Sequence, residues 1–221
     1  MRAHRVLDDV LGTIPRPSWR GRSHLIAVVA IAPALVILVF LAHGARDRAG
    51  VIVYGICLSS MLVASTTYHR WVHTLHWRRI WRRADHAMIF VAIAGTFTPL
   101  CLALFPTRAA VLALVAVWAA ALTGATIKGL GWRRGDPFAA GMYIANGWAG
   151  VALVPALLGA GLIVPLALLG VGGVVYTIGA LGFLRGWPTL RPGVFSYHEV
   201  WHLCTLGAAG LHLATIWMVT T

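Results

Sequence analysis

Residues 84–105 read ADHAMIFVAIAGTFTPLCLALF, and this stretch decides the fold class. After Asp85 it contains no Asp, Glu, Lys or Arg. A helix rising about 1.5 Å per residue crosses the hydrocarbon core of a bilayer in about 20 residues. The apolar side chains follow one another without alternation, which disfavours a transmembrane β-strand. The stretch therefore predicts a transmembrane helix whose first turn carries Asp85 and His86.

Six further stretches have the same character: residues 24–42, 51–69, 109–127, 138–158, 162–184 and 196–219. The whole chain is 59% hydrophobic and only 11% charged, whereas a soluble domain carries about 25% charged residues. We therefore predict an all-α integral membrane protein with seven transmembrane helices in residues 24–221. In the preceding segment, residues 1–23, the apolar residues Val6, Leu7, Val10 and Leu11 predict a short helix at the membrane surface.

The basic residues predict the orientation. Of the 18 Lys and Arg, 15 lie in residues 1–23 and in the second, fourth and sixth connections between the expected helices. Cytoplasmic connections are the ones enriched in Lys and Arg, so the N-terminus is expected inside and the C-terminus outside. We expect a multi-pass protein of the cell's inner (plasma) membrane. The net charge of +12 then reflects topology and contact with anionic headgroups, and no nucleic-acid partner is expected.

Polar residues gather where three expected helices meet the inner face. The helix over 51–69 ends in STTYH, the helix over 84–105 begins with ADH, and the helix over 196–219 begins with SYHEVWH. Ionisable groups within the membrane are costly and are functional candidates by default. His198 and His202 are four residues apart, which places them on one helix face and lets them share a metal ion.

These residues predict a zinc site. His69 would join His198 and His202 as a third ligand, leaving the fourth tetrahedral position for water, as in catalytic zinc sites. Asp85 could accept a hydrogen bond from that water, and Ser65 could bond to the water or orient a ligand. We expect His86 either to support this site or to be solvated at the interface. The other histidines are expected to have no part in the site. His24 and His43 are expected at the two membrane interfaces, and His212 is expected to be a hydrogen-bonded core residue.

Together these residues resemble the hemolysin III family, the bacterial branch of the progestin and adipoQ receptor group. The matching elements are Ser65-x-x-x-His69, Asp85-His86, the segment AGTFTP at 94–99, and HExWH at 198–202. The resemblance extends from about residue 25 to the end. It implies a seven-helix fold with the N-terminus inside, zinc bound by His69, His198 and His202, and Asp85 and Ser65 holding the zinc water. The wider superfamily includes alkaline ceramidases, which suggests lipid amide hydrolysis. The family name reflects a cytolytic phenotype of some members, and nothing in this sequence looks pore-forming.

Three functions remain open on the sequence. The leading one is a zinc-dependent hydrolase of a membrane lipid amide or ester, active in membrane lipid homeostasis, with Asp85 as general base. The second is an intramembrane metalloprotease, because residues 198–202 also satisfy H-E-x-x-H with Glu199. Against it, Glu199 falls in the first turn of a helix, where a carboxylate also suits the positive end of the helix dipole. The third is a receptor or regulator whose zinc is structural and links the helices over 51–69 and 196–219.

Overall fold

The computed structural model describes residues 16–131 and 136–221, and the surface helix predicted around Val6 to Leu11 lies outside them. The elements are α2 (Arg22–Leu41), α3 (Gly44–Thr66), η1 (Thr67–Trp71), α4 (Leu75–Leu104), α5 (Thr107–Gly129), α6 (Asp136–Trp148), η2 (Ala149–Leu153), α7 (Val154–Gly159), α8 (Ile163–Arg185) and α9 (Tyr197–Thr220). Within the described residues, seven helical stretches are long and apolar enough to cross a membrane, as predicted.

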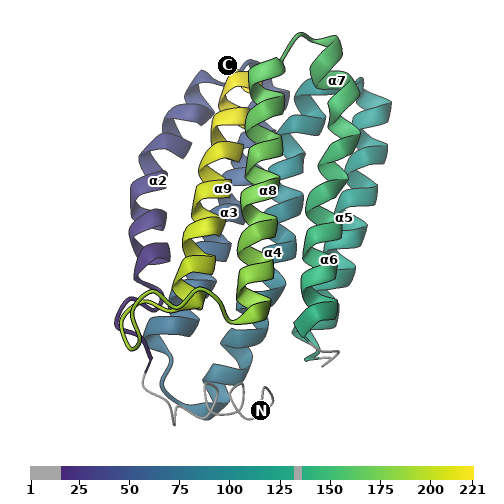
Figure 1. Cartoon of the computed structure of the whole chain (residues 1–221). Coiled ribbons are helices and arrows are strands. Elements are labelled where there is room, and N and C mark those ends of the chain that lie inside the picture. The colour runs from purple at the N-terminus through teal and green to yellow at the C-terminus, as the bar shows by residue number, and fades with distance from the viewer. Residues whose placement is uncertain (1–15, 132–135) are drawn as a thin grey trace.

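These helices stand side by side in one bundle (Figure 1). The start of α2 and the α8–α9 connection lie at one end of the bundle, and the C-terminus lies at the other. We call the first of these the basic end, because η1 and the start of α4 also lie there and carry Arg70, Arg78, Arg79, Arg82 and Arg83. It is the end predicted to face the cytoplasm from the distribution of Lys and Arg.

Two helices begin seven or more residues before the predicted spans. Helix α4 starts at Leu75 rather than at residue 84, because the Thr74 side chain caps it by accepting a hydrogen bond from the Trp77 N–H. The arginine-rich segment before Asp85 is therefore helical and not a loop. Helix α3 starts at Gly44 rather than at residue 51, so that only Ala42 and His43 separate it from α2.

The fifth span is not one continuous α-helix. It runs through α6, the 3₁₀ turn η2 and α7, and Pro155 stands in the first turn of α7. Proline has no N–H to continue the hydrogen bonding of the preceding turn, so the helix is interrupted there. The tight turn predicted at residues 159–161 is present, with Gly161 at a φ of +70°.

The core lies between α2, α3, α4 and α9 and includes Leu38, Val51, Tyr54, Leu62, Leu100 and Ile216. Gly95 of α4 faces Cys57 of α3 so closely that a Cβ at Gly95 would overlap the Cys57 side chain. This close approach aligns the end of α3 with the first turns of α4. Many large apolar side chains on the outside of the bundle are exposed, as suits a surface that faces lipid.

Candidate metal centre

Three histidines from two separate segments converge at the basic end. His69 belongs to η1, and His198 and His202 lie one turn apart at the start of α9. One ring nitrogen from each lies within 4.8 Å of the others. The ring centroids are 4.7 Å apart for His69 and His198, 5.0 Å for His69 and His202, and 4.8 Å for His198 and His202. The three residues predicted as ligands therefore form one cluster that can hold a metal ion.

The position of His69 depends on a change of helix type. Helix α3 ends at Thr66 and the chain continues as the π-helical turn η1, a wider turn that often occurs at functional sites. After Trp71 the chain becomes extended, so the last carbonyls of η1 lack helical partners. Arg16 supplies them: its Nη1 donates to the carbonyls of His69 (2.7 Å) and Tyr68 (3.3 Å).

The first turn of α9 is fixed by a capping box. The Ser196 side chain accepts a hydrogen bond from the His198 N–H (3.3 Å), and the Ser196 N–H donates to Glu199 Oε2 (2.7 Å). This reciprocal arrangement satisfies backbone donors that a helix start otherwise leaves open. It also sets the direction of α9 at the point where His198 and His202 project from it.

Two ring nitrogens of these histidines make no hydrogen bond within the described part of the chain. They are the buried atoms His69 Nε2 and His202 Nδ1. A buried polar atom left unsatisfied destabilises a fold by about 1–3 kcal/mol. Neutral imidazole nitrogens are common ligands of zinc and similar metals. The donor set and the unsatisfied atoms together fit a metal ion bound by His69, His198 and His202.

Asp85 and Ser65 lie beside this cluster. Asp85 Oδ2 is 3.8 Å from His69 Nε2, the nitrogen that lacks a partner, and 3.7 Å from His86 Nδ1. The Ser65 hydroxyl lies beside the Asp85 carboxyl group. The structure thus brings all five residues singled out from the sequence to one place. Ser65 lies beside Asp85 here, and its predicted role of bonding to the zinc water or orienting a ligand stays a prediction.

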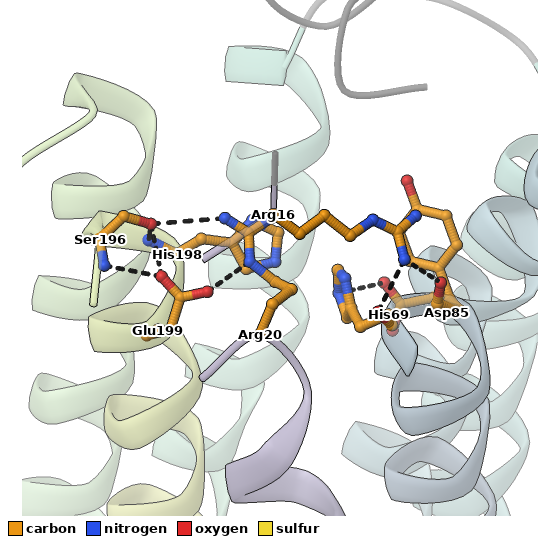
Figure 2. A network of polar contacts seen from close by, with 8 residues as sticks. Arg16, Arg20, His69, Asp85, Ser196, His198 and Glu199 are labelled. Carbon is orange, nitrogen blue, oxygen red and sulfur yellow. Dashed lines mark hydrogen bonds and ion pairs between the residues drawn. The ribbon is translucent and has the colours of Figure 1, made fainter. Parts of the chain in front are cut away.

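Glu199, the residue on which the metalloprotease hypothesis depends, contacts Arg20 and Ser196. Its side chain is 2% exposed. Oε1 is ion-paired with Arg20 Nε, and Oε2 accepts from both the N–H and the hydroxyl of Ser196. Figure 2 shows Glu199 turned toward Ser196 and Arg20. Because both carboxylate oxygens are engaged in the capping network, the geometry gives Glu199 a structural role and disfavours a metalloprotease.

Sequence reasoning missed three residues at the site. His24, expected at an interface, is 3% exposed and stacks on the His202 ring with centroids 4.0 Å apart and planes 11° apart. Its Nε2 lies 3.4 Å from the hydroxyl of Thr205. Arg16 and Arg20 had been counted only as charges that indicate topology. Their position in the sequence could have indicated a role at the site, because all three precede or begin the first apolar stretch, at the same end of the expected bundle as the other polar residues.

The other histidines of the described residues lie outside the three-histidine cluster. His86 is beside Asp85, and its Nδ1 is 2.8 Å from the Arg82 carbonyl, so it supports the site and is also partly exposed. His43, His73 and His76 are exposed. His212, expected to be a hydrogen-bonded core residue, lies on α9 ten residues beyond His202 and outside the ligand cluster. It lines the cavity described next, and its buried Nε2 has no hydrogen-bond partner among the described residues.

The site opens into a cavity of about 250 Å³ between α3, α4, α6, α8 and α9. Ser65, Asp85, His198 and His202 line one part of it. Most other lining residues are apolar and reach deep into the bundle, among them Leu58, Phe97, Leu100, Val154 and Leu166. From Asp85 to Leu100 along α4 is 15 residues, or about 22 Å at 1.5 Å per residue. The cavity therefore joins a polar end at the candidate metal centre to a long apolar interior.

Comparison with known proteins identifies the family of this chain. Residues 13–213 match the family described as "Haemolysin-III related". The chain is 29% identical over 204 residues to the "Hemolysin-3 homolog" of Bacillus subtilis (strain 168), which covers 89% of this chain and 91% of that protein. It is 30% identical over 196 residues to the "Hemolysin-3" of Bacillus cereus, covering 86% of this chain and 84% of the relative. As its motifs predict, the chain belongs to the haemolysin III-related family.

Proposed function

We propose that this protein is a zinc-dependent hydrolase that cleaves an amide or ester bond of a membrane lipid in the inner (plasma) membrane. The observation that carries the proposal is the position of Asp85. Its carboxylate lies 3.8 Å from His69 Nε2, a buried imidazole nitrogen that makes no hydrogen bond, and it lines the polar end of an apolar cavity. A proton acceptor, a cluster that can hold a metal and an apolar cavity thus meet at one point.

The ligand set supports a catalytic rather than a purely structural metal. Structural zinc sites are closed by four protein ligands, whereas catalytic sites keep one position open beside three protein ligands. Three histidines make up the cluster within the described residues. Zinc held there would supply a Lewis acid that polarises a carbonyl group and lowers the pKa of water.

Asp85 is the residue placed to move the proton. A carboxylate beside the three-histidine cluster can accept a proton from the attacking water and return it to the departing amine or alcohol. The Ser65 hydroxyl, buried at the end of α3, lies beside that carboxyl group and can donate a hydrogen bond that holds its orientation. The catalytic roles that we propose are therefore general base for Asp85 and orientation of Asp85 for Ser65.

The cavity supports a lipid as the substrate. An acyl chain that moves from the bilayer into an apolar cavity stays in an apolar environment, whereas a peptide would have to bury backbone N–H and C=O groups without partners. A chain lying along Ile93, Phe97 and Leu100 of α4, which all line the cavity, would place its carbonyl carbon near Asp85 at the basic end. The arrangement favours a long-chain lipid amide or ester over a peptide.

A metal with a purely structural role is the second candidate. His69 and the α9 pair come from segments more than 100 residues apart, so an ion between them would also tie η1 to α9. This candidate needs no turnover, and Asp85 would then only accept hydrogen bonds.

The test compares Asp85→Asn with the wild type in nanodiscs at equal zinc content. Lipid amides and esters with isotope-labelled acyl chains serve as substrates, and mass spectrometry measures release of the labelled acid. Asp85→Asn should keep its zinc and lose about 10²- to 10⁴-fold in rate, the usual contribution of a general base. Asp47→Asn, at the other end of α3, is the matched control and should keep full activity. Undiminished turnover by Asp85→Asn would contradict the proposed mechanism, and zinc-loaded wild type that cleaves no lipid would favour the structural candidate.

A further inference from the structure

A short segment outside the ligand-bearing helices crosses the candidate metal centre. We name residues 16–21, which precede α2, the N-terminal strap. The backbone N–H groups of Ser18 and Trp19 donate to the carbonyls of Gly193 and Val194 in the α8–α9 connection, at 3.2 and 3.3 Å. The Trp19 ring also packs on Phe195, with centroids 6.5 Å apart. The strap is thereby held beside the residue that caps α9.

Arg20 is the strap's link to α9. Its side chain is 8% exposed, its Nε is ion-paired with Glu199, and its Nη2 lies 3.4 Å from the Ser196 hydroxyl. Glu199 immediately follows His198 in the first turn of α9. A charge buried without its partner is strongly unfavourable, so removal of Arg20 should make Glu199 and this turn rearrange.

The same strap also contacts the opposite side of the three-histidine cluster. Arg16 donates to the carbonyl of His69 at 2.7 Å, and Gly21 lies against the His69 side chain. One turn further, His24 stacks on His202. Figure 2 shows Arg20 reaching Glu199 and Ser196 on one side, with Arg16 reaching toward His69 on the other. Ligands from η1 and from α9 are thus both held by contacts from outside their own helices.

We propose that Arg20 is a positioning residue of the metal centre. Through Glu199 and Ser196 it fixes the first turn of α9, so that His198 and His202 face His69 across the distance that a shared ion requires. The affinity for metal then depends on the N-terminal strap as well as on the three ligands. This inference rests on the metal site of the proposed function but not on hydrolysis.

The test measures zinc affinity of the full chain in detergent, by competition with a chromophoric chelator, together with the visible spectrum of the cobalt-loaded protein. Loss of a residue that orients metal ligands typically lowers metal affinity 10- to 100-fold, and we expect a loss of about this size for Arg20→Ala, with an altered cobalt spectrum. Arg20→Lys should recover part of the affinity, because it keeps the charge but lacks the planar fork of donors. Arg22→Ala is the matched control: Arg22 is exposed and packs on Trp19, and its loss should change neither quantity.

Wild-type zinc affinity and cobalt spectrum in Arg20→Ala would overturn the inference. So would a loss of thermal stability of the metal-free protein without any spectral change, because that pattern indicates a merely structural ion pair. If Arg20→Ala does not fold, Arg20→Lys decides in the same way, since its spectrum must differ from that of the wild type. A wild type that binds no zinc would refute the metal site and the proposed function together, whereas unchanged affinity in Arg20→Ala refutes only the role of Arg20.

Discussion

Replacement of Gly21 by alanine should damage the metal centre from a position that carries no side chain of its own. Gly21 has a φ of +74°, in the left-handed region that residues with a Cβ avoid. A Cβ at Gly21 would also lie 2.7 Å from the Cβ of His69 and 3.1 Å from the Cγ of Arg70. The substitution therefore combines backbone strain with a collision against a candidate metal ligand.

The two contributions can be separated with a second glycine. Gly44 at the start of α3 has a φ of +70°, and a Cβ added there would meet nothing within 4 Å. The left-handed conformation costs an L-residue about 1–2 kcal/mol, which applies to both positions. Forcing an extra carbon into a packed site adds about 1–3 kcal/mol, which applies to Gly21 alone. We expect the free energy of unfolding to fall by about 2–5 kcal/mol for Gly21→Ala and by about 1–2 kcal/mol for Gly44→Ala.

The assay is equilibrium unfolding of the detergent-solubilised protein in SDS, followed by tryptophan fluorescence, with zinc affinity measured on the same samples. Gly21→Ala should weaken zinc binding because His69 must shift, and Gly44→Ala should leave zinc binding unchanged. Equal losses of stability in the two variants, with wild-type zinc affinity in both, would refute the close contact between the N-terminal strap and His69.

Three further predictions test other parts of the structure. Glu199→Gln removes one charge of a buried ion pair and should lower the free energy of unfolding by about 3–5 kcal/mol, again in SDS titration; a change near zero would contradict the pairing with Arg20. Acid should release the metal and higher pH should retain it, because a protonated imidazole cannot bind a cation; metal content after equilibration at a series of pH values measures this, and full retention in acid would count against histidine ligands. A reporter fused after Thr221 should be active only outside the cytoplasm and one inserted after His73 only inside, and the reverse pattern would overturn the predicted orientation.

The features that the sequence predicted well are local ones. Each span is recognisable because its own residues are apolar over the thickness of a bilayer, and His198 and His202 pair because four residues make about one helical turn. The placement of His69 and Asp85 at the same end of the bundle follows from counting residues along each span. Those local rules were enough to place five residues at one end of the bundle.

The features that the sequence did not predict depend on contacts between distant segments. Arg20 and Glu199 are 179 residues apart, and no local pattern pairs them. His24 lies at the edge of an apolar run, so it looks interfacial until α2 packs against α9 and buries it on His202. The π-helical turn at His69 is also invisible in the sequence, because it requires Arg16 to satisfy the carbonyls at its end.

The central claim is that His69, His198 and His202 bind one metal ion, and metal content measures it most directly. Protein purified in detergent, without added metal or chelator, should contain about one zinc per chain by mass spectrometry. His69→Ala and the double variant His198→Ala/His202→Ala should each lose most of it, whereas His212→Ala, on the same helix but outside the cluster, should keep it. Full zinc occupancy in the double variant would contradict the claim.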